Sequence, residues 1–131
     1  MPSYEETIKF TAPIKNGVVV KVYDGDTFTL ATKLPYETSP MFRFSVHIRG
    51  LKSPDMKSLL PLNREEAKKS RDALSNLIYG KMIELKQIDT DRYGNIIANV
   101  YYNGIDITEW MINNDYSGDS NSGSKEYDRY H

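Results

Sequence analysis

The sequence predicts an α+β protein that is mainly β, with about five strands and about two helices. Three observations support this fold class: segments in which apolar and polar residues alternate, Gly- and Asn-containing turns between those segments, and one long segment with helical spacing in the middle. The 131 residues fit one domain, and a hydrophobic content of 39% is enough for a core.

The clearest strand is predicted over residues 42–49. Apolar residues alternate there with polar ones, so one face carries four apolar side chains and the other includes His47 and Arg49. Further strands are predicted at residues 18–23, 27–32, 83–88 and 96–102. Turns are expected at Asn16-Gly17, Tyr93-Gly94-Asn95 and Asn103-Gly104.

Two helices complete the predicted set. The first runs from about residue 64 to 79, where Asn63 is expected to cap the start together with Glu66 and Gly80 suits the end. Its apolar stripe consists of Ala67, Leu74, Leu77 and Ile78. The second, shorter helix is expected to start at Asp106, with Glu109 at its third position. Ile107, Trp110 and Met111 should face the core.

Composition excludes several classes of function. The chain contains no cysteine, so it has no disulfide, no Cys-based zinc site and no thiol nucleophile. Two histidines cannot build a His-rich metal site. The net charge of −1 argues against a broad basic nucleic-acid-binding face unless charge is segregated. With no apolar leader segment and no run of about 20 apolar residues, we expect a soluble intracellular protein without a membrane partner, in a compartment left open.

Four landmarks occur in order along the chain. They are Asp24-Gly25-Asp26-Thr27, Ser53-Pro54-Asp55, the central helix, and Asp91-Arg92-Tyr93-Gly94. With their spacing, over roughly residues 18 to 116, they resemble the staphylococcal-nuclease-like (thermonuclease) family. The resemblance implies a five-stranded OB-fold barrel with about two helices. The domain would span 18–116, after an N-terminal extension or first strand (1–17) and before a polar C-terminal tail (117–131).

The resemblance also implies a calcium site, which the family builds from two aspartates and a backbone carbonyl. Asp26 matches the first aspartate, and Ser53 stands at the carbonyl position. The second aspartate is replaced by Lys52, whose ammonium group would compete with Ca²⁺ for Asp26. No cofactor is therefore expected, and Ca²⁺ only if the site is active.

The catalytic positions that the resemblance implies are largely substituted. The family glutamate, assigned as the base, falls on Asp55, and the two phosphate-binding arginines fall on His47 and Asn95. Arg49, two residues beyond His47 on the same strand face, is a candidate surrogate, and Arg92 is a second.

These replacements lead to three hypotheses. The first is a catalytically degenerate pseudoenzyme that binds single-stranded nucleic acid or protein, resembling the repeat domains of Tudor-staphylococcal-nuclease proteins, and that could be a subunit of a larger assembly. The second is a weak Ca²⁺-dependent nuclease, hydrolysing DNA or RNA phosphodiesters with Asp26, Asp55 and Arg49. The third is a structural protein without a nucleic-acid partner. The sequence leans away from an enzyme.

Structural alternatives accompany the site residues. Asp24 to Asp26 could simply form a tight turn, and Lys52 could make an ordinary ion pair. The segment from Asp91 to Asn95 is a turn under either interpretation.

Overall fold

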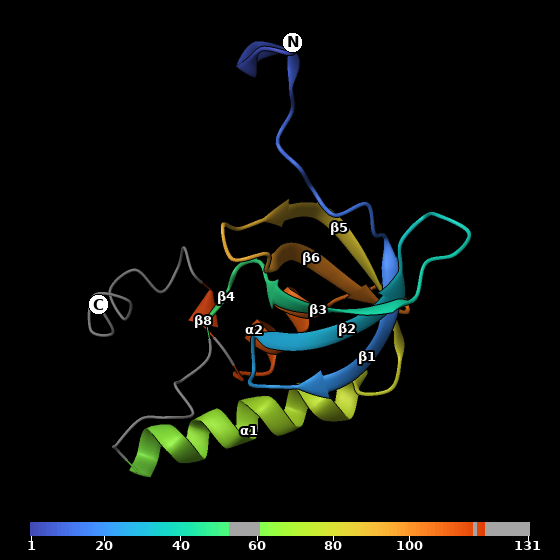
Figure 1. Cartoon of the computed structure of the whole chain (residues 1–131). Coiled ribbons are helices and arrows are strands. Elements are labelled where there is room, and N and C mark those ends of the chain that lie inside the picture. Colours follow the sequence, from blue (N-terminus) through green and yellow to red (C-terminus); the bar gives the residue numbers. More distant parts are fainter. Residues whose placement is uncertain (53–60, 117, 120–131) are drawn as a thin grey trace.

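The computed structural model describes residues 1–52, 61–116 and 118–119. Five strands form a barrel: β1 (Asn16–Val22), β2 (Thr27–Lys33), β3 (Met41–Ile48), β5 (Met82–Thr90) and β6 (Ile96–Tyr102). They follow the order β3-β2-β1-β5-β6 with antiparallel neighbours, and a parallel pairing of β3 with β6 closes the barrel. The predicted mainly-β barrel with two helices is thus confirmed (Figure 1).

The remaining elements are the two helices and several short segments. The helices are α1 (Pro61–Ile78) and α2 (Ile107–Asn113). The short segments are a 3-10 turn (Tyr4–Glu6), β4 (Leu51–Lys52), β7 (Ile105–Asp106) and β8 (Gly118–Asp119), with β4 paired to β8 and β7 to β6. The N-terminal segment runs away from the barrel before β1 begins (Figure 1). In the described part of the chain, no helix has the length and apolar character that crossing a membrane requires.

The alternation in β3 places its second half in the core. Val46 and Ile48 are fully buried, whereas Phe42 is 37% exposed. The reason lies in the pairing, because β6 covers only residues 46–48 of β3 while the other half pairs with β2 alone. The predicted apolar face is therefore right for the closed part of the barrel and wrong for the open end at Phe42.

The predicted turn at Asn16-Gly17 is wrong, because both residues belong to β1 and pair with β5. Gly17 is required there by a close approach of strands. A Cβ atom at Gly17 would lie 2.6 Å from the carbonyl oxygen of Ala31 on β2, well inside van der Waals contact. The glycine therefore marks a tight strand contact rather than a chain reversal.

Helix α1 begins at Pro61, earlier than predicted, so Asn63 lies in its first turn and is not the N-cap. Proline suits the first helical position because the N–H group it lacks would have no partner within the helix there. The predicted end is confirmed, since the helix stops at Ile78 and Gly80 adopts a φ of 76°. Ala67, Leu74 and Ile78 are fully buried on its inner face.

Helix α2 starts as predicted. The Asp106 carboxylate accepts a hydrogen bond from the Glu109 N–H group at 3.2 Å, which caps the first turn. Ile107 and Met111 are fully buried. Trp110 is half-buried and stacks on the Tyr116 ring, with the ring centroids 5.7 Å apart. The helix thus presents its apolar face to the core through all three predicted residues.

Candidate functional site

The Asp-Gly-Asp-Thr segment forms the connection between β1 and β2. The Asp24 carboxylate accepts a hydrogen bond from the Asp26 N–H group at 3.0 Å, and the Thr27 hydroxyl donates to the Asp26 carboxylate at 3.0 Å. The Ile48 N–H group donates to the Asp26 carbonyl at 2.8 Å, which ties the turn to β3. These bonds confirm the tight turn, and they also hold the buried Asp26 carboxylate in a fixed position.

The Asp24 carboxyl group of this turn is perturbed by burial and by its neighbour Asp26. Burial, then a side-chain hydrogen bond with Asp26 and charge repulsion from Asp26, together raise the pKa of Asp24 to about 7, against the opposing effect of backbone N–H groups. The sequence patterns did not single out Asp24 for this property, because the effect depends on how deeply the turn is buried.

His47 lies on β3 beside this turn. Burial lowers the pKa of His47, and the nearby negative charge of Asp24 opposes that shift without cancelling it. The imidazole is therefore neutral at pH 7. His47 is the residue that the resemblance places at the first phosphate-binding arginine. The chain therefore has a half-buried, neutral imidazole there.

Arg49 does share the outward face with His47, as predicted. His47 is paired with Ile97 on β6, and Ile97 is paired with Asp89 on β5, so these side chains form one row across the barrel surface. The Arg49 guanidinium lies 2.6 Å from the Asp89 carboxylate and donates to the Gln87 carbonyl at 2.6 Å. Both partners are on β5, on the side of β3 opposite to β2, so Arg49 extends away from the Asp24–Asp26 turn.

Asn95, at the position of the second family arginine, belongs to the turn between β5 and β6. Its side-chain amide donates to the Asp91 carboxylate at 3.2 Å and its backbone N–H group does so at 2.9 Å. The Tyr93 N–H group donates to the same carboxylate at 2.8 Å. The predicted turn is confirmed, and Asn95 stabilises it. Arg92, the second surrogate candidate, lies over the Tyr93 ring at 4.9 Å.

The remaining predicted positions lie at or beyond the end of β4. Lys52 is half-buried on β4, where its backbone is paired with Gly118. Ser53 and Asp55 lie outside the described residues, so their predicted roles as carbonyl ligand and base stay predictions.

The described residues offer few of the oxygen ligands that a calcium site requires. Ca²⁺ takes about six to eight oxygen ligands, usually including several carboxylates. The described residues contain no cluster of three or more acidic, His or Cys side chains, and the turn contributes Asp24 and Asp26 alone. Asp24 and Asp26 alone supply fewer oxygen ligands than Ca²⁺ takes, and the other donors that the resemblance implies, Ser53 and Asp55, lie outside the described residues.

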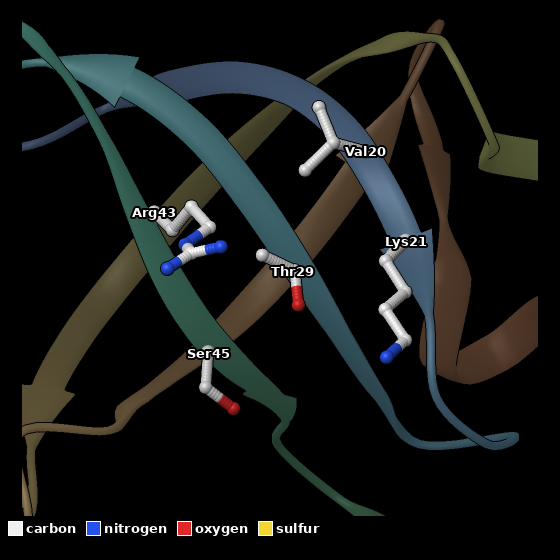
Figure 2. Close-up of a pocket in the computed structure, with 5 residues that line it drawn as sticks. All are labelled: Val20, Lys21, Thr29, Arg43 and Ser45. Carbon is white, nitrogen blue, oxygen red and sulfur yellow. The ribbon is translucent and has the colours of Figure 1, made fainter.

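A groove on the outer face of β1, β2 and β3 was not anticipated as a site. Its lining residues are Val20, Lys21, Thr29, Arg43 and Ser45, and its volume is about 470 Å³ (Figure 2). The signal was present in the sequence, because Arg43 and Ser45 belong to the same outward-facing alternation as His47.

A closed five-stranded barrel with two helices and an acidic turn between β1 and β2 fits the class of nuclease-type OB-fold barrels. Comparison with known proteins gives the family: residues 45–130, more than half of the chain, match the family described as staphylococcal nuclease homologue. The chain belongs to this family, and the resemblance seen in the sequence is confirmed.

Relatives support the assignment. The chain is 32% identical over 75 residues to the probable staphylococcal-like nuclease CAN3 of Oryza sativa subsp. japonica, and 31% identical over 75 residues to CAN2 of the same plant. It is 30% identical over 70 residues to an uncharacterized 38.1 kDa protein of Capnoides sempervirens. The matches cover 53% to 57% of this chain but only 18% to 19% of these relatives. The chain thus spans less than a fifth of their length.

Proposed function

We propose that this chain is a staphylococcal-nuclease-like domain whose hydrolytic site is degenerate and which acts as a binding module for nucleic acid or protein, as part of a larger assembly. One observation carries the proposal: neither family arginine position supplies a cation to the Asp24–Asp26 turn. His47 is neutral through burial, and Asn95 is bonded within its own turn.

The expected cost to catalysis is large. An arginine that stabilises charge in phosphoryl transfer contributes roughly 10³ to 10⁵ in rate. The nearest strand neighbour, Arg49, is held by Asp89 and Gln87 on β5 and would have to break a charge-assisted contact before reaching a phosphate. Lys52 places an ammonium group where the family has a metal-binding carboxylate, which disfavours a divalent cation at Asp26.

The experiment pairs a calcium titration by calorimetry with cleavage of single-stranded DNA, with and without Ca²⁺. We expect no heat of specific binding and no hydrolysis above background. A matched variant restores the family residues by His47→Arg, Lys52→Asp, Asp55→Glu and Asn95→Arg, and it shows whether the assay detects a repaired site. Ca²⁺-dependent hydrolysis by the unaltered protein at a rate well above background would disprove the proposal.

A second candidate is a weak Ca²⁺-dependent phosphodiesterase. The Asp24–Asp26 pair favours it, because two crowded carboxyl groups gain from a cation placed between them. The description of the rice relatives as probable nucleases points in the same direction. This candidate predicts that millimolar Ca²⁺ raises Tm and that Asp26→Ala abolishes both the shift and the activity. An unchanged Tm would contradict it.

A further inference from the structure

The groove on β1, β2 and β3 gathers polar side chains from three neighbouring strands. Lys21 on β1, Thr29 on β2 and Ser45 on β3 lie in one row, since Lys21 is paired with Thr29 and Thr29 with Ser45. Arg43 belongs to the next row along β3. Figure 2 shows Thr29 on the middle strand, between Arg43 on one side and Lys21 on the other. A β-bulge between Val19 and Lys21 turns Val20 outward into the groove as well.

The charge of this face differs from that of the whole chain. The three strands contain Lys21, Lys33 and Arg43 and not one acidic residue, although the chain has a net charge of −1. Among the residues that the structure describes, neither Lys21 nor Arg43 forms an ion pair. Positive charge is thus segregated on one surface and is not neutralised by neighbours. A chain with a net charge near zero needs such segregation to bind nucleic acid.

The lining groups match one kind of ligand. Two cations that flank two hydroxyl groups offer charge-assisted and neutral hydrogen bonds to an anion with several oxygen atoms, and a guanidinium fits phosphate oxygens well. The groove runs over the open face of a sheet, so it suits a point along an extended chain better than an enclosed small molecule.

An aromatic ring lies in the adjoining row. The Tyr23 N–H group bonds to the Thr27 carbonyl at 3.0 Å, and Thr27 is paired with His47, so these three residues follow the Lys21 row along the strands. Two residues of a strand span about 6.5 to 7 Å, a length comparable to one nucleotide of an extended strand. Tyr23 is 49% exposed and can stack on a base.

We propose that this groove binds a phosphodiester group of a single-stranded nucleic acid, with Arg43 and Lys21 neutralising the phosphate. Thr29 and Ser45 donate hydrogen bonds to it, and Tyr23 stacks on a neighbouring base. The proposal rests on the binding function proposed above, and it selects nucleic acid over protein as the partner. The Asp24–Asp26 turn would repel a phosphate, but the Tyr23 row separates this turn from the Lys21 row that holds the phosphate.

The test measures binding of a fluorescent oligothymidylate by anisotropy at several salt concentrations. The variant Lys21→Gln/Arg43→Gln removes both groove cations. The control Lys68→Gln/Lys69→Gln changes net charge equally at two exposed positions of α1. We expect the groove variant to raise Kd at least about tenfold at low salt, because charge-assisted contacts are lost. It should also reduce the magnitude of the salt slope by about 0.7, the value for the single phosphate contact that the groove makes with a single strand. The control should leave both quantities unchanged.

Two further arms locate the contact and its source. Tyr23→Leu should weaken oligothymidylate binding about fivefold to 150-fold without changing the salt slope, because stacking contributes about 1 to 3 kcal/mol per base. Inorganic phosphate at the same concentrations should compete poorly. Thermal melts serve as the check that the variants, which alter exposed or half-buried side chains, remain folded.

The outcomes separate this proposal from the one it rests on. Equal losses in the groove and control variants would overturn the groove, and so would the absence of oligothymidylate binding by the unaltered protein. Competition by inorganic phosphate as strong as that by oligothymidylate would overturn the nucleic-acid assignment and leave a free-phosphate site. None of these results requires hydrolysis, whereas Ca²⁺-dependent cleavage would disprove the degenerate site and leave the groove to be judged by its variants.

Discussion

Replacing Asp24 by Asn should stabilise the folded protein, and only at neutral and alkaline pH. The substitution keeps the side-chain oxygen that accepts the hydrogen bond from the Asp26 N–H group at 3.0 Å. It removes the ionisable group that burial and Asp26 disfavour in its charged form. The turn geometry is thus preserved while the electrostatic penalty is lost.

The magnitude follows from the pKa of Asp24, which is raised from 3.8 to about 7. Between these values the folded state retains a proton that the unfolded chain has released, so the stability of the unaltered protein falls as pH rises from about 4 to about 7. The full shift corresponds to about 4 kcal/mol at roughly 1.36 kcal/mol per unit. Because Asp24 is only half-buried, solvent screening reduces this to about 1 to 2 kcal/mol.

Urea unfolding of both proteins at pH 4 and pH 8 measures the effect. We expect equal free energies of unfolding at pH 4 and a gain of about 1 to 2 kcal/mol for Asp24→Asn at pH 8. Asp72→Asn, which makes the same chemical change on the exposed face of α1, serves as the control. A difference that is the same at both pH values, or a loss of stability at pH 8, would refute the reasoning.

Two other predictions test elements that hold the site in place. Gly17→Ala should lower the free energy of unfolding by about 1 to 3 kcal/mol, since its Cβ would lie 2.6 Å from the Ala31 carbonyl oxygen; a urea titration showing a loss below about 0.5 kcal/mol would contradict this close approach. Asp91→Ala should lower Tm at pH 7, because the Asn95 and Tyr93 N–H groups lose their acceptor. Desolvation raises the pKa of Asp91, but the N–H groups of Asn95 and Tyr93 outweigh it and hold that pKa below its ordinary value. The stability that the Asp91 carboxylate contributes is therefore lost as pH falls through the lowered pKa. The difference in Tm between the two proteins should shrink in acid. A Tm difference that persists unchanged at low pH would contradict this account.

Local pattern was sufficient for most of the elements. The alternation in residues 42–49 and the capping pair of Asp106 and Glu109 are short-range signals, and the structure confirms both in their essentials. The predicted start of the first helix was a few residues late. Asn63 has the side chain of an N-cap, but proline is well suited to the first helical position and the helix begins at Pro61. Gly17 was misassigned because a glycine that permits close strand packing has the same local appearance as a glycine in a turn.

The sequence could name the candidate site residues, but it could not predict their burial, their ion pairs or their neighbours on other strands. The sequence by itself determined the family and the barrel, because these depend on residue type and on spacing along the chain, whereas the substitutions that the resemblance implies at His47, Lys52 and Asn95 stay predictions. Only the tertiary structure decided that Arg49 faces Asp89, that burial lowers the pKa of His47, and that Lys21 and Arg43 share a groove. The physical reason is that desolvation, ion pairing and charge segregation arise between strands brought together by barrel closure, and strand register across that closure is not encoded in any single segment.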